Sequence, residues 1–223
     1  TLTDPQHKTN GELTRFDKVI ANPPFSQNYV KKDLPAFFNT RFCYGYPPEK
    51  KKADFMFLQH MIAVLNENGK MACVMPHGVL FRGGEEKNIR RGIISDGVLE
   101  AVIGLPANLF FGTGIPAAIL IFNKGKGANK DILFIDASKE FENGKNQNKL
   151  RETDIEHIVN AYKAYKQASP LSAEKGEVIE DKYSYRATIA DIVENDYNLN
   201  IPRYVDTFEE EEEVDIKATH AKI

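Results

Sequence analysis

A short apolar stretch that ends in two adjacent prolines constrains this chain more than any other part of its sequence. Residues 16–21 include the β-branched Val19 and Ile20, a pattern that predicts a strand buried in a parallel sheet. The strand is followed directly by Asn22-Pro23-Pro24-Phe25. Because each proline disfavours the helical region for the residue before it, we expect the chain to leave the sheet in a stiff, extended conformation.

The residues after this strand also carry an unusual set of polar groups. Prolines lack an N–H donor, so Pro23 and Pro24 offer only backbone carbonyls, and the side chain of Asn22 adds another carbonyl oxygen beside its amide. Such a segment suits a ligand that donates hydrogen bonds, for example an aromatic amine that stacks on the ring of Phe25. An ordinary proline turn with an incidental asparagine explains the same residues, and local physics favours that simpler interpretation.

The composition is that of a globular protein. The 223 residues, 42% of them hydrophobic and 27% charged, are enough for one substantial domain, alone or with an appendage. The net charge of -3 gives no overall basic field for nucleic acid, although local patches are compatible with it. Cys43 and Cys73 cannot form a disulfide framework, no cysteine or histidine has zinc-site spacing, and no stretch resembles a signal peptide or a membrane span. We therefore predict a cytoplasmic protein without a metal.

Helical and strand patterns alternate along the chain. Apolar spacing predicts a helix at 54–65, capped by Asp54 and stopped at Asn68-Gly69, and another at 85–95. Further strands are expected at 70–75, 99–105, 115–122 and 131–136.

This order predicts an α/β sheet. Helical crossovers imply parallel strands with helices on both faces, whereas the last two strands, which are close in sequence, imply an antiparallel hairpin at the edge. Since the carboxyl ends of parallel strands share one edge of a sheet, we expect Asn22, His77 and Asn108 to gather there.

The pattern changes after residue 138. A capping box at 153–156 predicts a helix, Thr188 is expected to cap a second helix at about 189–194, and a polar, aromatic segment follows at 197–205. We therefore divide the chain into residues 1–138, which contain the sheet, and a helical and irregular extension at 139–223.

The tetrad at residues 22–25 resembles the catalytic motif of S-adenosylmethionine-dependent amino-methyltransferases, in particular the adenine-specific DNA methyltransferases. Enzymes that methylate glutamine side chains or RNA guanines share it. Other segments, in the same order along the chain, resemble the modification subunit of type I restriction-modification systems, and they lie at 53–60, 76–90, 105–116 and 197–204. Together they cover nearly the whole chain, which favours that family.

The resemblance implies a role for each residue of the tetrad. The partial Rossmann-like methyltransferase sheet would present Asn22, Pro23, Pro24 and Phe25 to an adenine flipped out of duplex DNA. The amino group would donate to the Asn22 side chain and the Pro23 carbonyl, and the base would stack on Phe25. Phe110 or Phe111 would form a second wall of the base site, unless both lie in the core.

The resemblance also implies a cofactor and partners. S-adenosylmethionine would supply the methyl group, and a specificity subunit would read the DNA between two modification subunits, with a restriction subunit in the full complex. The extension at 139–223 is our candidate for docking the specificity subunit.

One departure from the family pattern concerns the cofactor. The Gly-rich turn and the acidic residue that hold S-adenosylmethionine in the family do not precede Asn22 here. We therefore expect a fragment that carries the second half of the sheet and is inactive on its own. The alternatives are an amino-methyltransferase that acts on RNA or protein glutamine, and a non-catalytic assembly module.

Overall fold

The computed structural model describes residues 1–48, 53–169, 171 and 175–207. The last part of the predicted extension, residues 208–223, lies outside these described residues.

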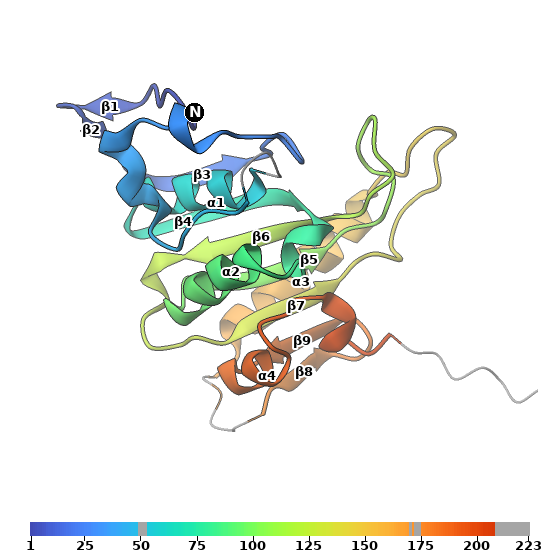
Figure 1. Ribbon diagram of the computed structural model, residues 1–223. Coiled ribbons are helices and arrows are strands. Elements are labelled where there is room, and N and C mark those ends of the chain that lie inside the picture. The colour runs from blue at the N-terminus through green and yellow to red at the C-terminus, as the bar shows by residue number, and fades with distance from the viewer. Residues whose placement is uncertain (49–52, 170, 172–174, 208–223) are drawn as a thin grey trace, which may run out of the picture.

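A seven-stranded sheet organises the chain, with the strand order β3-β4-β6-β5-β7-β9-β8 (Figure 1). Its strands are β3 (Phe16–Ala21), β4 (Leu65–Pro76), β5 (Leu99–Gly104), β6 (Ala117–Asn123), β7 (Ile132–Asp136), β8 (Glu177–Glu180) and β9 (Ser184–Ala187). A separate two-residue hairpin of β1 (Lys8–Thr9) and β2 (Glu12–Leu13) precedes them. The predicted α/β sheet is confirmed.

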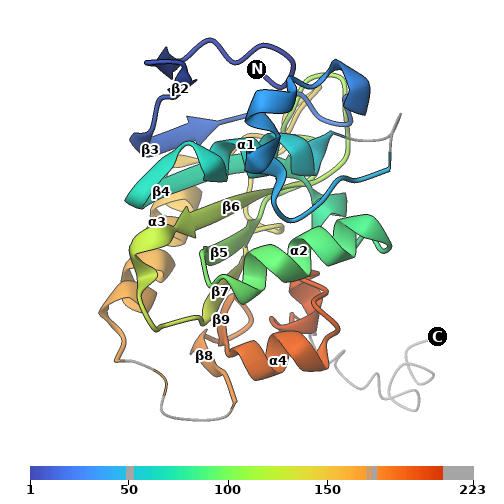
Figure 2. The ribbon, with the colours of Figure 1, turned by 60° about the vertical axis from the view of Figure 1, so that its left-hand side comes forward.

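The helices cover both faces of the sheet. They are α1 (Asp54–Ala63), α2 (Glu85–Ser95), α3 (Glu152–Gln167) and α4 (Ile189–Glu194). Side chains of α1, α2 and α4 pack in one large cluster on one face, and α3 packs on the other face, as Figures 1 and 2 show. The apolar spacing of α1 and α2 arises because one side of each helix is buried against the strands.

The position of β6 corrects the predicted hairpin. β6 runs antiparallel between β4 and β5, and β7 pairs with β5 in parallel, so β6 and β7 do not pair with each other. Strands that are close in sequence usually pair in the sheet. Here the polar turn between β6 and β7 crosses the amino end of β5, which lies between the two strands. The antiparallel hairpin at the sheet edge is instead β8–β9, two strands that the sequence pattern did not predict.

β3 is an edge strand, not a buried one. None of its residues is buried, Asp17 and Lys18 are both exposed, and the side chain of Ile20 is 89% exposed. Val19 packs against the core, so one face of the strand is apolar and covered while the other is open.

Two predicted helix caps are also wrong. The carboxylate of Asp54 does not cap α1, because it bonds to the loop after β3. Helix α3 starts two residues earlier than predicted, and there the carboxylate of Asp154 accepts from the backbone N–H of Arg151 at 2.8 Å. The predicted cap of α4 is confirmed, since the hydroxyl of Thr188 accepts from the backbone N–H of Asp191. The division at residue 138 stays a prediction, although β9 pairs directly with β7 and so joins the two parts in one sheet.

Candidate functional site

The predicted site residues follow strands that end at the same edge of the sheet. β3 and β4 are parallel neighbours, and Asn22 and His77 are the residues directly after them. β5 runs in the same direction, so the loop that contains Asn108 leaves from this edge too. The backbone N–H of His77 donates to Pro116, which ties the β4 end to the start of β6. Burial lowers the pKa of His77, which favours a neutral imidazole.

The polar groups at the end of β3 are open to a ligand. Asn22 is exposed, and its side chain makes no hydrogen bond to any other residue that the structure describes. Pro23 is half-buried and Pro24 is exposed, and all three residues line a hollow of about 530 Å³ beside the outer edge of β3. The carbonyl oxygen of Asn22 is therefore accessible at the point where the strand ends.

Two phenylalanines from different segments meet next to this strand end. The rings of Phe25 and Phe110 lie with centroids 5.8 Å apart in an edge-to-face contact of 68°. Phe111, the following residue, is 90% exposed and lies at the tip of its turn. The structure therefore separates the two candidate wall residues: Phe110 faces Phe25, and Phe111 faces solvent.

A buried carboxylate fixes the loop that follows the tetrad. Asp54, which is 2% exposed, accepts a hydrogen bond from the backbone N–H of Ser26 at 3.1 Å and pairs with Arg82 at 2.8 Å. Ser26 has a φ of 57°, a left-handed conformation that this bond helps to hold. A Cβ on Gly78 would lie 2.6 Å from Nε of Arg82, so a larger residue there would displace this side chain.

Arg82 extends this tether to α2. It pairs with Glu86 at 2.9 Å, and burial raises the pKa of the Glu86 carboxyl while Arg82 opposes that change. The sequence pattern predicts only a capping role for Asp54 and no role for Arg82. Both residues lie in segments that carry the family resemblance, which was the one signal that could have identified them.

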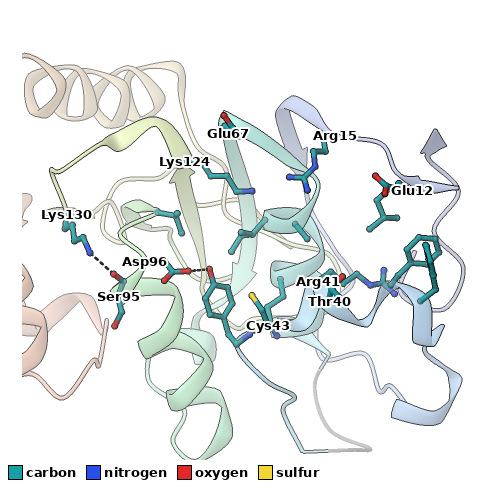
Figure 3. A pocket seen from close by; sticks show the side chains of 18 residues that line it. Glu12, Arg15, Thr40, Arg41, Cys43, Glu67, Ser95, Asp96, Lys124 and Lys130 are labelled. Atoms are coloured by element: carbon teal, nitrogen blue, oxygen red, sulfur yellow. Dashed lines mark hydrogen bonds between the residues drawn. The ribbon is translucent and has the colours of Figure 1, made fainter. Parts of the chain in front are cut away.

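A second, larger hollow lies at the other end of the strands, near the amino ends of β3, β4 and β5. Its volume is about 1000 Å³, and Figure 3 shows side chains from the start of β3, the end of β6 and the end of α2 around it. Arg15 and Lys124 both reach into it, and burial, with the nearby Arg15 charge, lowers the pKa of Lys124. None of the predicted site residues lines this hollow, so it is not the site at the end of β3.

Neither a metal centre nor a membrane span is found in the part of the chain that the structure describes. No group of three or more histidine, cysteine, aspartate or glutamate residues there is arranged to hold a metal ion. No helix within the same residues has the length and apolar character needed to cross a bilayer.

Comparison with known proteins gives one family over nearly the whole chain. The family model for N-6 DNA methylases matches residues 1–213. The chain is 37% identical over 217 residues to the type I restriction enzyme MjaVIII methylase subunit of Methanocaldococcus jannaschii, covering 94% of this chain and 35% of that protein. It is 34% identical over 210 residues to the MpnII methylase subunit of Mycoplasma pneumoniae, covering 93% of this chain and 36% of that protein.

A solved structure gives the same result. The fold is similar to the crystal structure of a type I restriction-modification methyltransferase subunit from Streptococcus thermophilus, with a TM-score of 0.78, 46% identity, and coverage of 93% of this chain and 41% of that one. The chain thus spans about a third of the length of the curated relatives it matches. The chain belongs to the N-6 DNA methylase family, and its relatives there are methylase subunits of type I restriction enzymes.

Proposed function

We propose that this chain forms the target-base half of an adenine-specific DNA methyltransferase of a type I restriction-modification system. The observation that carries the proposal is the exposed side chain of Asn22 at the carboxyl end of β3, which has no hydrogen-bond partner among the described residues and lies three residues before the ring of Phe25. An acceptor-rich strand end next to an aromatic ring is what recognition of an aromatic amine requires. Membership of the N-6 DNA methylase family supports adenine as that amine.

The residues of the tetrad have separate tasks in this proposal. An adenine flipped from duplex DNA stacks on Phe25, which contributes ~1–3 kcal/mol against a flipping cost of a few kcal/mol. Its amino group donates one N–H to the Asn22 carbonyl oxygen and the other to the carbonyl of Pro23. These acceptors favour a pyramidal nitrogen, whose lone pair is then less delocalised into the ring, and they stabilise the positive charge that grows there during attack.

The contact between Phe25 and Phe110 limits how the base is held. A base sandwiched between two parallel rings needs about 7 Å between them, since each stacking contact takes roughly 3.5 Å. The observed centroid distance of 5.8 Å, with the rings at 68°, is too short for such a sandwich. We therefore assign Phe25 to the face of the adenine and Phe110 to its edge.

S-adenosylmethionine, which the family implies, would supply the methyl group, but no cofactor site is assigned to this chain. Residues 77–84, which join β4 to α2, contain Gly78, Gly83 and Gly84, but they have neither the G-x-G-x-x-G spacing nor the lysine of a phosphate-binding loop. The open outer edge of β3, with Ile20 89% exposed, is where another strand would extend the sheet and bring such a turn next to Asn22. The greater length of the relatives supports this arrangement.

The proposed partners are DNA, a specificity subunit, a second modification subunit and, in the full complex, a restriction subunit. The names of the relatives, which are subunits of type I restriction enzymes, support membership of such a complex. We keep the extension after residue 138 as the candidate docking region, and deletion of α4 with retained assembly would exclude that part of it.

Methyl transfer by a chain of the relatives' length that contains these residues tests the function. DNA, RNA and a glutamine-containing protein are offered in turn, each with and without the specificity subunit. We expect methylation of adenine in DNA only, and only with that subunit. Methylation of RNA or glutamine instead would favour the alternative amino-methyltransferases, and no transfer despite cofactor binding by calorimetry would favour an assembly module.

A further inference from the structure

Two loops project side by side from the carboxyl ends of the parallel strands, the end of the sheet at which Asn22 also lies. Residues 105–116 join β5 to β6, and residues 137–151 join β7 to α3. Figure 1 shows both at the upper right, extending beyond the strands. We call them the paired loops.

The paired loops are built structures that brace each other. Hydrogen bonds between them link Asn148 N to Asn108 O at 2.9 Å, Asn148 Nδ2 to Ala107 O at 2.9 Å and Gln147 Nε2 to Leu109 O at 3.3 Å. Within the second loop, Glu142 and Lys149 exchange two backbone hydrogen bonds of 2.8 and 3.0 Å. The tips are therefore held in fixed positions relative to each other.

The tip of the first loop presents Phe111 to solvent. A bridge between Phe110 and Thr113 closes a tight turn in which Gly112 has a φ of 76°. In a turn with a left-handed residue at its third position, the second residue points away from the strands, and here that residue is Phe111. It is 90% exposed, and Ile115 in the same loop is 58% exposed. Packing among the described residues does not explain why this turn carries the Phe111 ring.

The second loop adds positive charge beside this ring. Residues 138–151 hold four basic and two acidic side chains, a net charge of +2 in a chain whose total is -3. One of the acidic residues, Glu140, is bonded to His157 at 2.8 Å. Lys145 and Lys149 are exposed and take part in none of the ion pairs found within the described ranges. They are available to an anionic partner.

We propose that the paired loops grip duplex DNA beside the target base and that Phe111 is a wedge that enters the base stack where the flipped adenine leaves it. An apolar ring inserted between bases replaces the stacking that the flipped base gave up, and the lysines of the second loop contact the backbone phosphates. Phe110 stays against Phe25 at the base itself. This inference rests on the proposed function and gives the two adjacent phenylalanines different tasks.

The exposure of a phenylalanine alone would not carry this assignment. Phe37, in the 3-10 helix Ala36–Phe42, is 72% exposed as well, but it lies in a separate segment outside the paired loops and without their braced turn. Phe37→Ala is therefore a matched control for Phe111→Ala. Because both rings are exposed, neither change is expected to unfold the protein.

The test uses the methylating complex of the full-length chain and its specificity subunit. Flipping is measured by the fluorescence of 2-aminopurine placed at the target position, and methylation, which needs the 6-amino group, is measured on the same sequences with adenine there. Each duplex is made in two forms, one fully paired and one with an abasic site opposite the target. On the paired duplex, Phe111→Ala should lower flipping and methylation about tenfold or more. On the abasic duplex, where the base is already unpaired, most of this loss should disappear. Phe37→Ala should match the wild type on both.

The outcomes separate the wedge from the proposed function. Equal loss on both duplexes, or no loss on either, would overturn the wedge while leaving methylation by the wild-type complex intact. A wild-type complex that methylates no DNA would overturn the proposed function and the wedge with it.

The phosphate contacts are tested by salt dependence. For Lys145→Gln with Lys149→Gln, the slope of the logarithm of DNA affinity against the logarithm of salt concentration should become shallower by about 2, since about one counterion is released per phosphate contact. Exposed lysines outside residues 139–223, changed as Lys8→Gln with Lys130→Gln, should leave the slope unchanged. An unchanged slope in the first pair would overturn the role of the second loop.

Discussion

The two sides of the sheet use polar side chains in opposite ways. On the β9 side, the guanidinium of Arg186 is 1% exposed and pairs with the buried carboxylate of Asp131, to which Tyr165 of α3 also donates at 3.2 Å. At the β3 edge, Asn22 is exposed and has no partner among the described residues. A polar group that is buried and paired holds the fold, whereas one that is exposed and unpaired next to a ring is available to a ligand.

A second buried carboxylate, Glu100, also stabilises the fold through polar contacts with α3. Glu100 of β5 is 0% exposed and accepts from Asn123 at 2.5 Å and from Lys166 of α3 at 3.1 Å. Both buried carboxylates thus attach α3 to the sheet. If this contrast is correct, changes on the two sides should affect different quantities: stability on the β9 side and activity at the β3 edge.

The largest expected effect is on stability, from Arg186→Leu. It leaves Asp131 buried without its ion partner, which should lower the free energy of unfolding by about 3–5 kcal/mol. Urea denaturation measures the change. Lys87→Leu, which removes a pair with the exposed Asp196, is the control and should cost far less, because water screens an exposed ion pair. Similar losses in both variants would remove the distinction between buried and exposed pairs.

At the opposite edge, Asn22→Ala should change activity alone. Loss of one preorganised partner of the reacting group should lower the methylation rate about 10²–10³-fold, which corresponds to roughly 3–4 kcal/mol in the activation barrier. The free energy of unfolding should change by less than about 0.5 kcal/mol. Single-turnover methylation and denaturation of the same variant give the two values. Asn28→Ala, at an exposed asparagine further along the segment, should retain the wild-type rate. Retained turnover by Asn22→Ala would refute its assigned role.

Asp54 lies between these extremes, because it is buried like the structural residues but bonds to the loop of the site. Asp54→Asn keeps an acceptor for the N–H of Ser26 but loses the charge that pairs with Arg82. We expect kcat to fall about tenfold with little change in KM for DNA, and a larger fall for Asp54→Ala, because a displaced tetrad misaligns the amino group. If kcat and stability fell in proportion in both variants, the residue would have no positioning role.

The smallest expected effect is a pH dependence of stability near the paired loops. Burial alone would lower the pKa of His157, but hydrogen bonds of its ring to Glu180 and Glu140 outweigh this and raise the pKa. The resulting stabilisation is fully present below the ordinary pKa of about 6.5 and is lost as the pH rises through the raised value. The free energy of unfolding of the wild type should therefore exceed that of His157→Gln by about 0.5 kcal/mol more at pH 5.5 than at pH 8, after allowance for solvent screening. A difference that grows with pH would contradict this sign.

The sequence predicted the elements of the sheet better than their order. Apolar periodicity located α2 at Glu85–Ser95, because the pattern and the Gly83-Gly84 break are local properties. The insertion of β6 between β4 and β5 depends on long-range pairing, which local patterns do not encode. The short strands β8 and β9 escaped notice for the same reason, since their residues become a sheet edge only by pairing with β7.

For the site, the tetrad at 22–25 was predictable from the sequence, but the contacts that hold it in place were not. Consecutive prolines after an apolar strand stand out in any sequence, and the strand end placed Asn22 at the expected edge. The bond from Ser26 to Asp54 joins residues 28 positions apart, and the contact between Phe25 and Phe110 joins residues still further apart. The roles of the site residues themselves stay predictions.

The most direct test of the account is a structure of the full-length complex with its DNA and a cofactor analogue. We predict that the flipped adenine stacks on Phe25 and that its amino nitrogen lies about 3 Å from both the Asn22 side-chain oxygen and the Pro23 carbonyl. An adenine that stays in the duplex, or is flipped into another pocket without these two contacts, would contradict the assignment of the target-base site to this chain.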